Sequence, residues 1–496
     1  MDGVTTLTWP DFLLVGLCVA ALFVFGLWGG RKEETTSDFF LGGRRIPWWA
    51  AMLSFIATEI SAMTIIGVPA TSFRENWQYL QFFIGSAGAR IVIAFLFIPA
   101  FYRFDCTTIY EFLRHRFGRQ TQTMASLFFF VTRLLASGVR LMAACVAVSV
   151  LLDWPLIPVI LLFSLVSAAY IGYGGIKAVI WTNVFQAGVF VVSGLATLVF
   201  LLSVVDGGFS GVLAAAGPAG RLNLVNLGPA WGEPEFLKKF FSDPNILWIA
   251  LLNGFFGSMA AFGTDQELMQ RLLTVETRRE SQKTMLLTIL GSFLVLVLYM
   301  AIGTGLFAYY QQNPALAPQA ELDKVYPFFA AHAMPALLRG GLLAAVIMAS
   351  IDSPLASLSS SFVTDLYRPL IRLNADEKHY LFVSRVCVAF FGVLLAFIAY
   401  GFSFFDKMLW LAFKIGGVTY GSLLGVFLLG LLSERRSNRA NVWAMAAMGF
   451  VNLALLALSE LKVIHLGWSW LILTGTFGTI ALAWILGPVL DREPAK

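Results

Sequence analysis

The residues from Gly341 to Tyr367 combine a long apolar run with oxygen-bearing side chains near its middle. Hydroxyls at Ser350 and Ser353 and the carboxylate of Asp352 come just before Pro354. Clustered oxygens without His or Cys favour a hard cation over a transition metal. Because proline has no N–H and its ring clashes with the carbonyl four residues earlier, Pro354 frees the Ser350 carbonyl, one turn from the Ser353 hydroxyl. One helix face thus offers half of a cation site, unless Ser353 bonds back to its own helix.

A second polar run, IATEISAMTIIG, carries Glu59 in the middle of another apolar segment. A carboxylate in hydrocarbon is costly unless it faces a cavity or a partner, so Glu59 has either a functional role or a structural ion pair. Glycines at 254, 257 and 263 make residues 244–265 look interruptible as well. Interrupted helices in corresponding halves of a chain indicate an inverted-repeat transporter with a site at the membrane midplane.

Basic residues within apolar runs are candidate anion ligands. Arg140 is the best candidate for binding a carboxylate, because its planar guanidinium matches that group. The alternative is that Arg140 pairs with Glu59 or Asp352. Lys414 has the same two interpretations, substrate contact or structural pairing. Asp352 lies off the face shared by Ser350 and Ser353, so an ion pair or a helix-to-helix hydrogen bond competes with ion binding.

The composition is that of a polytopic membrane protein. Of 496 residues, 58% are hydrophobic and 13% charged, whereas a soluble domain has about 25% charged residues. The fold class is therefore all-α, with about 13 transmembrane helices. We predict them at 11–30, 47–72, 80–102, 122–152, 156–173, 178–204, 244–265, 284–309, 335–366, 380–402, 408–432, 441–459 and 466–488.

Charges and cysteines exclude several classes of protein. The net charge of +5 resides in loops and offers no surface for nucleic acid. The four cysteines form no CxxC pair, which disfavours a disulfide framework or a metal site. Alternating the loops puts 22 Lys and Arg residues on the side of the C-terminus and 8 on the other. This excess predicts a cell (inner) membrane protein with its N-terminus outside and its C-terminus in the cytoplasm.

Six segments together resemble the sodium/solute symporter family, which includes sodium/glucose, multivitamin, proline and bacterial sialic acid symporters. They are DFFLGGRRIPWWAAMLSFIATEIS (38–61), TTIYEFLRHRFG (107–118), GGIKAVIWTNVFQ (174–186), GTDQELMQR (263–271), FAYYQQNP (307–314) and residues 350–367. The resemblance implies one transport domain, 1–496, with the inverted five-helix repeats of leucine-transporter-type proteins. The expected parts are a leading helix (11–30), two repeats (47–204 and 244–432) and two trailing helices (441–488).

The resemblance also implies a sodium site. Its ligands would be the carbonyls of Ala57, Ile60 and Ser350 and the hydroxyl of Ser353. Relatives often have a second Ser or Thr where this chain has Pro354, so the site is altered. Glu59 matches an aspartate that supports sodium binding in proline symporters.

A second sodium site is not expected. In some relatives that site depends on an aspartate in a WTDxxQ segment, and this chain has Asn183 at the position.

The implied substrate pocket contains Ser61, Thr64, Tyr79, Phe83, Ser258, Ala261 and Phe262. Ala261 stands where sugar-transporting relatives have an aromatic gate, which disfavours a sugar. Sialic acid symporters place a carboxylate-binding arginine near Ala136, one turn before Arg140. The favoured solute bears a carboxylate, as do sialic acids, monocarboxylates and amino acids, although this offset does not single out sialic acid.

We therefore expect a sodium-coupled symporter of a small organic solute that works by alternating access, as a monomer in the lipid bilayer. A proton-coupled or sugar symporter is the alternative within this class. A transporter-like membrane sensor or a channel is the alternative from another class. An enzyme is not expected, because the four histidines are scattered and form no catalytic cluster.

Overall fold

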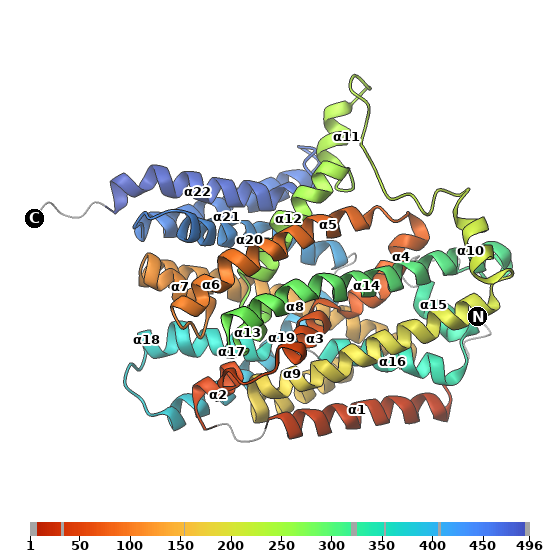
Figure 1. Ribbon diagram of the computed structural model, residues 1–496, viewed down its shortest axis with the longest axis horizontal. Helices are drawn as coiled ribbons and strands as arrows, with labels where there is room; N and C mark the ends of the chain where they lie inside the picture. Colours follow the sequence, from red (N-terminus) through yellow and green to blue (C-terminus); the bar gives the residue numbers. More distant parts are fainter. Residues whose placement is uncertain are drawn as a thin grey trace, which may run out of the picture.

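The computed structural model describes residues 7–30, 34–152, 154–318, 325–351, 354–404 and 408–491. The regular elements in these ranges are helices, most of which run along the long axis of the molecule (Figure 1). Ten are long and apolar enough to cross a membrane, and a bent pair makes eleven. Two shorter apolar helices, Leu156–Ala169 and Ala336–Ala349, fall in the remaining predicted spans. The prediction of an all-α polytopic membrane protein is confirmed.

The spanning segments follow the predicted order. They are α1 (Trp9–Gly29), α3 (Trp48–Glu59) with α4 (Ala62–Arg74), α5 (Tyr79–Val92) with η2 (Ile93–Phe97) and α6 (Ile98–Arg103), α8 (Arg119–Leu152), α9 (Leu156–Val204), α12 (Leu247–Gly263), α14 (Arg278–Gln312), α16 (Ala336–Ile351) with α17 (Leu355–Ser361), α19 (Glu377–Phe402), α20 (Met408–Leu432), α21 (Arg439–Glu460) and α22 (Trp470–Leu490). Gly175, with φ 50° and ψ −143°, divides α9 into the two spans predicted there.

Short helices connect the spans. They are α2 (Thr36–Leu41), α7 (Ile109–Arg116), α10 (Gly208–Ala216), α11 (Phe236–Ser242), α13 (Gln266–Leu273), α15 (Val325–Ala333), η5 (Phe362–Tyr367) and α18 (Arg368–Leu370). In Figure 1, α2, α7 and α18 gather at the left-hand end, and α10 and α15 lie at the right-hand end. This arrangement agrees with the predicted alternation of loops.

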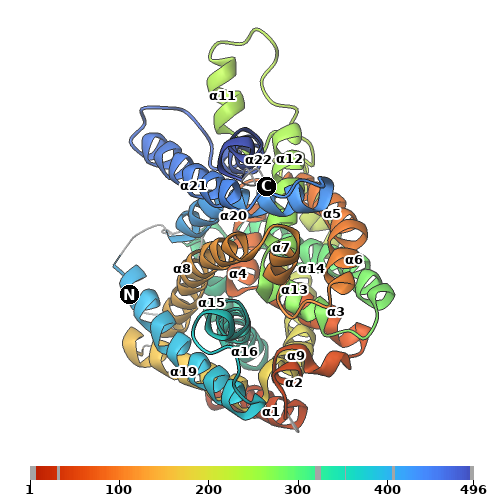
Figure 2. The same ribbon diagram turned by 90° about the vertical axis from the view of Figure 1, so that its left-hand side faces the viewer.

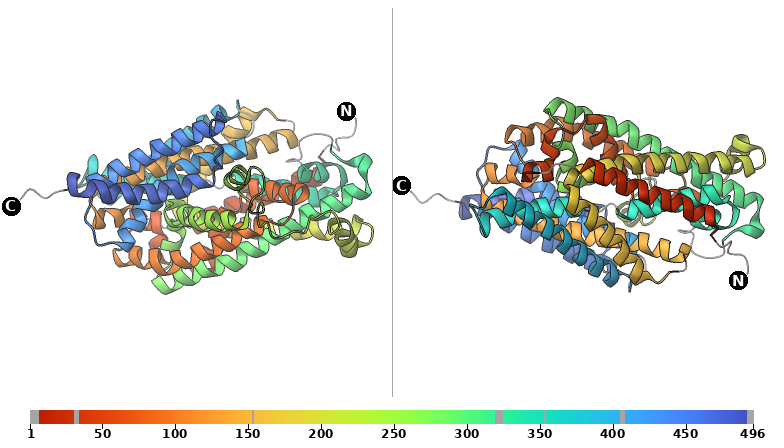
Figure 3. Two further views of the ribbon diagram at one scale, coloured as in Figure 1. Left: turned by 90° about the horizontal axis from the view of Figure 1, so that it is seen from above. Right: turned by 90° about the horizontal axis from the view of Figure 1, so that it is seen from below.

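The outermost helices lie on opposite sides of the bundle. Helices α20, α21 and α22 pack together on one side (Figure 2), and α1 packs on α9 and α16 on the other (Figure 3). The expected leading and trailing helices thus enclose the central helices. The boundaries of the two repeats stay a prediction.

The helix break predicted near Glu59 is confirmed. Helix α3 ends at Glu59, Ile60 is extended (φ −77°, ψ 106°), and Ser61 precedes α4. The two parts of this span meet at a bend of 58°. Pro354 (φ −72°, ψ 13°) stands at the N-cap position of α17, and residues 352–353 between α16 and Pro354 lie outside the described residues.

The interruption expected within residues 244–265 was wrong, because α12 is continuous from Leu247 to Gly263. The glycines permit close packing instead. A Cβ on Gly254 would lie 2.1 Å from the Phe82 carbonyl oxygen, and one on Gly85 would lie 2.2 Å from that of Leu251. Small residues that let two helix backbones approach are common between membrane helices. These glycines therefore hold α12 against α5.

Candidate functional site

The break between α3 and α4 positions the first half of the predicted sodium site. Ala57 lies in the last turn of α3 and Ile60 directly after it, and both are buried. The last carbonyls of a helix have no partner within that helix, so they can accept bonds from outside it. The Ser61 N–H donates to Thr64 Oγ1 at 3.3 Å, which holds two predicted pocket residues together at the start of α4.

The second half of the predicted site lies between α16 and α17. Ser350 lies in the last turn of α16, and Pro354 precedes α17. Ser353 and Asp352 lie outside the described residues, so their predicted roles stay predictions. A cavity of about 30 Å³ reaches the ends of these two helices and is lined by Ala349, Pro354 and Arg140, among others. It has room for one or two waters or small ions.

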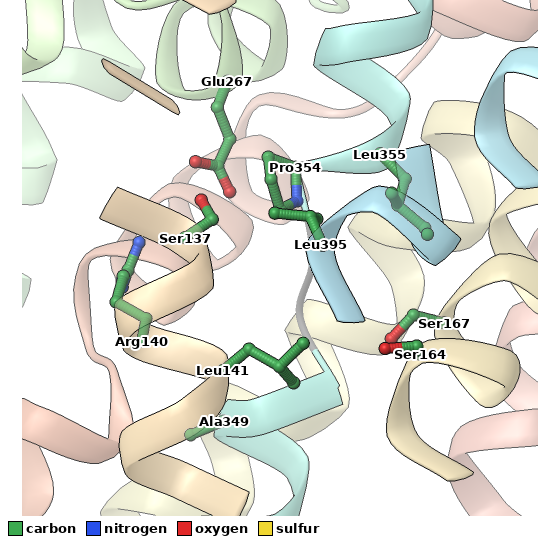
Figure 4. A pocket seen from close by; sticks show the side chains of 11 residues that line it. Ser137, Arg140, Leu141, Ser164, Ser167, Glu267, Ala349, Pro354, Leu355 and Leu395 are labelled. Atoms are coloured by element: carbon green, nitrogen blue, oxygen red, sulfur yellow. The ribbon is translucent and has the colours of Figure 1, made fainter. Parts of the chain in front are cut away.

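Figure 4 shows how this cavity is built. Ser137 and Arg140 come from α8, Ser164 and Ser167 from α9, and Pro354 stands at the start of α17. The hydroxyls of Ser137 and Ser164 are buried and have no hydrogen-bond partner among the described residues. The cavity is therefore polar on the α8 and α9 sides.

Arg140 contacts the first helix break. Its Nη2 donates to the carbonyl oxygen of Thr58 at 2.9 Å. Thr58 stands between Ala57 and Ile60, the residues whose carbonyls are assigned to sodium. The pairing with Glu59 considered from the sequence is not among the described contacts of Arg140, and Asp352 lies outside the described residues. Its guanidinium therefore lies beside the predicted sodium site and the cavity.

Glu59 makes a close ion pair with Arg90. Arg90 Nη2 lies 2.5 Å from Glu59 Oε1, and the Ser292 hydroxyl donates to Glu59 Oε2 at 2.6 Å. The Arg90 side chain is fully buried, whereas that of Glu59 is 24% exposed. Arg90 also donates to the Thr288 hydroxyl at 2.8 Å. This pair joins the end of α3 to α5 and α14.

Aromatic rings complete the surroundings of Arg90. Its guanidinium carbon lies 4.7 Å from the Phe262 ring centroid and 5.8 Å from those of Phe55 and Phe83. These are cation–π contacts in a desolvated place. Two predicted pocket residues, Phe83 and Phe262, thus share one environment with Glu59.

The other predicted pocket residues are placed differently. Ser258 is buried and Ala261 half-buried in α12, and Tyr79 is 38% exposed at the start of α5. Lys414 lines a separate cavity beside α21 and α22, and its Nζ lies 2.5 Å from Glu460 Oε1. Its role in substrate binding stays a prediction that this placement does not support.

A buried charged cluster was missed in the sequence. Arg133 of α8 contacts the carboxylates of Asp265 and Glu267, and all three side chains are buried. The Tyr420 hydroxyl donates to Asp265 Oδ2 at 2.8 Å. The two carboxylates belong to the segment GTDQELMQR, whose acidic residues were the available signal. The cluster connects α8 with α13 and α20 near the end of the molecule that carries α7.

Asn183 has a bridging position. Its amide lies 3.2 Å from Ser54 Oγ and 3.0 Å from Thr58 Oγ1. With its oxygen toward Arg271, the amide accepts from that guanidinium at 3.2 Å. A neutral side chain with these partners connects helices and adds no negative charge for a second cation.

Comparisons with known proteins agree with this geometry. The family model for the sodium:solute symporter family matches residues 39–448. The sodium/sialic acid symporter SiaT of Proteus mirabilis (strain HI4320) is 28% identical over 84% of this chain and 83% of its own length. Sodium-coupled monocarboxylate transporter 1 of Homo sapiens is 27% identical over 86% of this chain and 70% of its own length.

Solved structures show the same fold. A substrate-bound, outward-open Na⁺-coupled sialic acid symporter has a TM-score of 0.86 and 24% identity, covering 99% of both chains. MhsT in complex with L-phenylalanine has a TM-score of 0.51 and 14% identity, covering 89% of this chain and 99% of its own. The predicted leucine-transporter-type fold is confirmed. The relatives are sodium-coupled transporters and not enzymes. The match of the family model over most of its length shows that the chain belongs to the sodium:solute symporter family.

Proposed function

We propose that this transporter couples sodium entry to the uptake of a small solute that bears a carboxylate. The observation that carries the proposal is Arg140. Its guanidinium is half-buried beside the first helix break, and its hydrogen bond there goes to the neutral carbonyl of Thr58. A cation in the membrane interior needs an anionic partner or access to water. A substrate carboxylate would supply such a partner, because it can accept two parallel bonds from a guanidinium.

The cavity beside Arg140 also supports an anionic solute. Arg140 lines it together with the buried hydroxyls of Ser137 and Ser164, which have no hydrogen-bond partner among the described residues. These hydroxyls can donate hydrogen bonds to the oxygens of a bound carboxylate. Glu267 also lines the cavity, and its carboxylate is engaged by Arg133.

The relatives support the same class of solute. The names of the two groups of relatives refer to sialic acid and to monocarboxylates, which are both acids. The absence of an aromatic residue at Ala261 favours these over sugars. The contact with Arg140 would be the same for any carboxylate, so it does not distinguish one acid from another.

We further propose that sodium binds between the α3–α4 break and the facing ends of α16 and α17, and that it holds the substrate site open to the outside. The membrane potential contributes about 2.3 kcal/mol per charge per 100 mV to sodium entry. The Arg133 cluster joins α8 to α13 and α20 near the end of the molecule that carries α7. These ion pairs must therefore separate before the substrate site can open at that end. Both oxygens of Glu59 are already bonded within the protein, which favours a supporting role for this carboxylate.

Uptake into proteoliposomes tests the proposal. We expect a sodium gradient to drive accumulation of at least one solute from a panel of sialic acids, monocarboxylates and amino acids. The matching panel of neutral sugars and the alcohol analogues of the acids should not accumulate. Uptake driven by a proton gradient in sodium-free buffer, or uptake of a neutral sugar alone, would contradict it.

The placement in the cell membrane, with the N-terminus outside, and function as a monomer are also proposals. Labelling of single introduced cysteines in the α10 and α18 regions of intact cells tests the orientation. The α10 cysteine should react with an impermeant reagent and the α18 cysteine should not. Reversed labelling would contradict the orientation. Mass measurement of the purified protein tests the monomer.

A further inference from the structure

A second polar cavity lies at the end of the molecule that carries α2, α7 and α18. Its volume is about 260 Å³, and it is separate from the cavity of Figure 4. The polar side chains that line it are those of Thr36, Thr107, Glu111, Arg114, Thr364, Arg368 and Tyr380. The transport site described above uses none of these residues.

Two arginines make this cavity positively charged. Arg114 and Arg368 are exposed and have no ion pair or hydrogen bond among the described residues. The Arg368 guanidinium carbon lies 5.1 Å from the Tyr380 ring centroid, a cation–π contact that leaves its N–H groups available. Guanidinium groups that converge on one cavity are suited to a phosphate, since they bind its oxygens through paired hydrogen bonds.

Glu111, the carboxylate among the described lining residues, is already engaged. Glu111 Oε2 accepts from the N–H of Thr107 at 2.6 Å and from that of Thr108 at 3.2 Å, at the start of α7. The Thr36 hydroxyl donates to Glu377 at 2.9 Å. The hydroxyls of Thr107 and Thr364 have no partner among the described residues and can donate to a ligand.

Hydrogen bonds to neighbouring helices fix the position of η5, which forms one wall of the cavity. Thr364 belongs to η5, a π-helix, and π-helical turns frequently occur at functional sites. The next residue, Asp365, is buried and accepts hydrogen bonds from Thr108 at 2.6 Å, Gln122 at 2.8 Å and Ser126 at 3.0 Å. These bonds fix η5 against α7 and α8, so the arginine of α7 and that of α18 face a common space.

Exposed apolar side chains continue from the rim of the cavity. Leu370 is 55% exposed, and Ile371 and Leu373 are each 66% exposed. They alternate with Arg368 and Arg372 in the segment RPLIRL. Apolar and basic residues in one short surface segment are typical of contact with the boundary between lipid head groups and acyl chains.

We propose that this cavity binds the phosphate head group of an anionic phospholipid, with the acyl chains beside Leu370, Ile371 and Leu373. Charge complementarity and the apolar rim together favour a lipid over a free phosphate. The same end of the molecule carries the basic loops expected in the cytoplasm, where anionic lipid attracts Lys and Arg. A lipid bound there would hold η5, which continues from α17 of the proposed sodium site.

The test compares the stability of the protein in two kinds of lipid vesicle. One contains phosphatidylcholine alone, and the other equimolar phosphatidylcholine and phosphatidylglycerol. The variants are Arg114→Gln/Arg368→Gln and the matched control Arg436→Gln/Arg439→Gln, whose two arginines are also exposed. The measurements are the melting temperature in each vesicle and the binding of phosphatidylglycerol to the purified protein by native mass spectrometry.

We expect phosphatidylglycerol to stabilise the wild type and the control variant. Its affinity for the Arg114→Gln/Arg368→Gln variant should fall roughly 30-fold, because each basic residue near an anionic surface contributes about a fivefold factor. An equal response of the two double variants would overturn the proposal. If inorganic phosphate in phosphatidylcholine vesicles stabilises the protein equally, the cavity binds a free anion, and the proposal of a lipid site is rejected.

Discussion

Replacing Glu59 by Gln tests how the first helix break is supported. Gln keeps the size of the side chain and an oxygen for Ser292 and Arg90, but it removes the negative charge 2.5 Å from Arg90 Nη2. Arg90 is fully buried, and its remaining described partners are hydroxyls and aromatic rings. The variant therefore leaves an uncompensated guanidinium in the membrane interior.

The cost of this change follows from the separation and burial of the two charges. Opposite charges about 4 Å apart attract by about 4 kcal/mol at an effective dielectric constant of 20. Breaking a buried pair from one side typically costs about 3–5 kcal/mol. Because the Glu59 side chain is 24% exposed, we expect a loss of stability at the lower end of this range, about 3 kcal/mol. The Arg90→Met variant should lose a similar amount through the unpaired carboxylate.

The double variant Glu59→Gln/Arg90→Met separates a structural role from a functional one. With both charges gone, most of the lost stability should return, which gives a coupling free energy of about 3 kcal/mol between the two sites. If Glu59 also supports sodium, sodium affinity stays reduced although stability recovers. If the pair is only structural, both recover together. Reversible unfolding in denaturant and sodium-dependent thermal shift give the two quantities.

The Lys414–Glu460 pair is the matched control, since its charged atoms also lie 2.5 Å apart but Glu460 is 54% exposed. Solvent screening should limit the effect of Glu460→Gln to about 1 kcal/mol or less. If Glu59→Gln costs no more than this control, then burial does not make Arg90 depend on Glu59, and the reasoning fails.

Four further results are expected from the transport site. Ser353→Ala should abolish sodium-dependent uptake while the protein stays folded, and unchanged sodium affinity in the purified variant would reject the assignment. Pro354→Ala should weaken sodium binding by restoring the helical bond to the Ser350 carbonyl, whereas Pro354→Ser should weaken it less; equal affinities would refute this role. Arg140→Lys should impair uptake of a carboxylate at least tenfold with little change in melting temperature, because an ammonium cannot make the paired contact, and normal uptake would exclude the role. One sodium should enter per substrate, since Asn183 adds no negative charge; a reversal-potential ratio of two would contradict this, and Asn183→Asp is the reverse test.

The sequence determined the framework of this protein. The lengths of the apolar runs predicted the spans, because a bilayer requires about 20 apolar residues per helix. The interruption near Glu59 was also predictable, because a polar run in hydrocarbon alters the backbone within a few residues of itself. The order of the family segments then gave the fold and the coupling ion.

Only the tertiary structure decided which charges meet. Arg90 lies 31 residues from Glu59, and Arg133 lies 132 residues from Asp265. Helical periodicity says which face a side chain occupies but not which helix covers that face. The glycines of α12 show the same limit, since their sequence is compatible with a break or with close packing. The Phe82 carbonyl against Gly254 selected packing, because a neighbouring backbone occupies the space that a side chain would need.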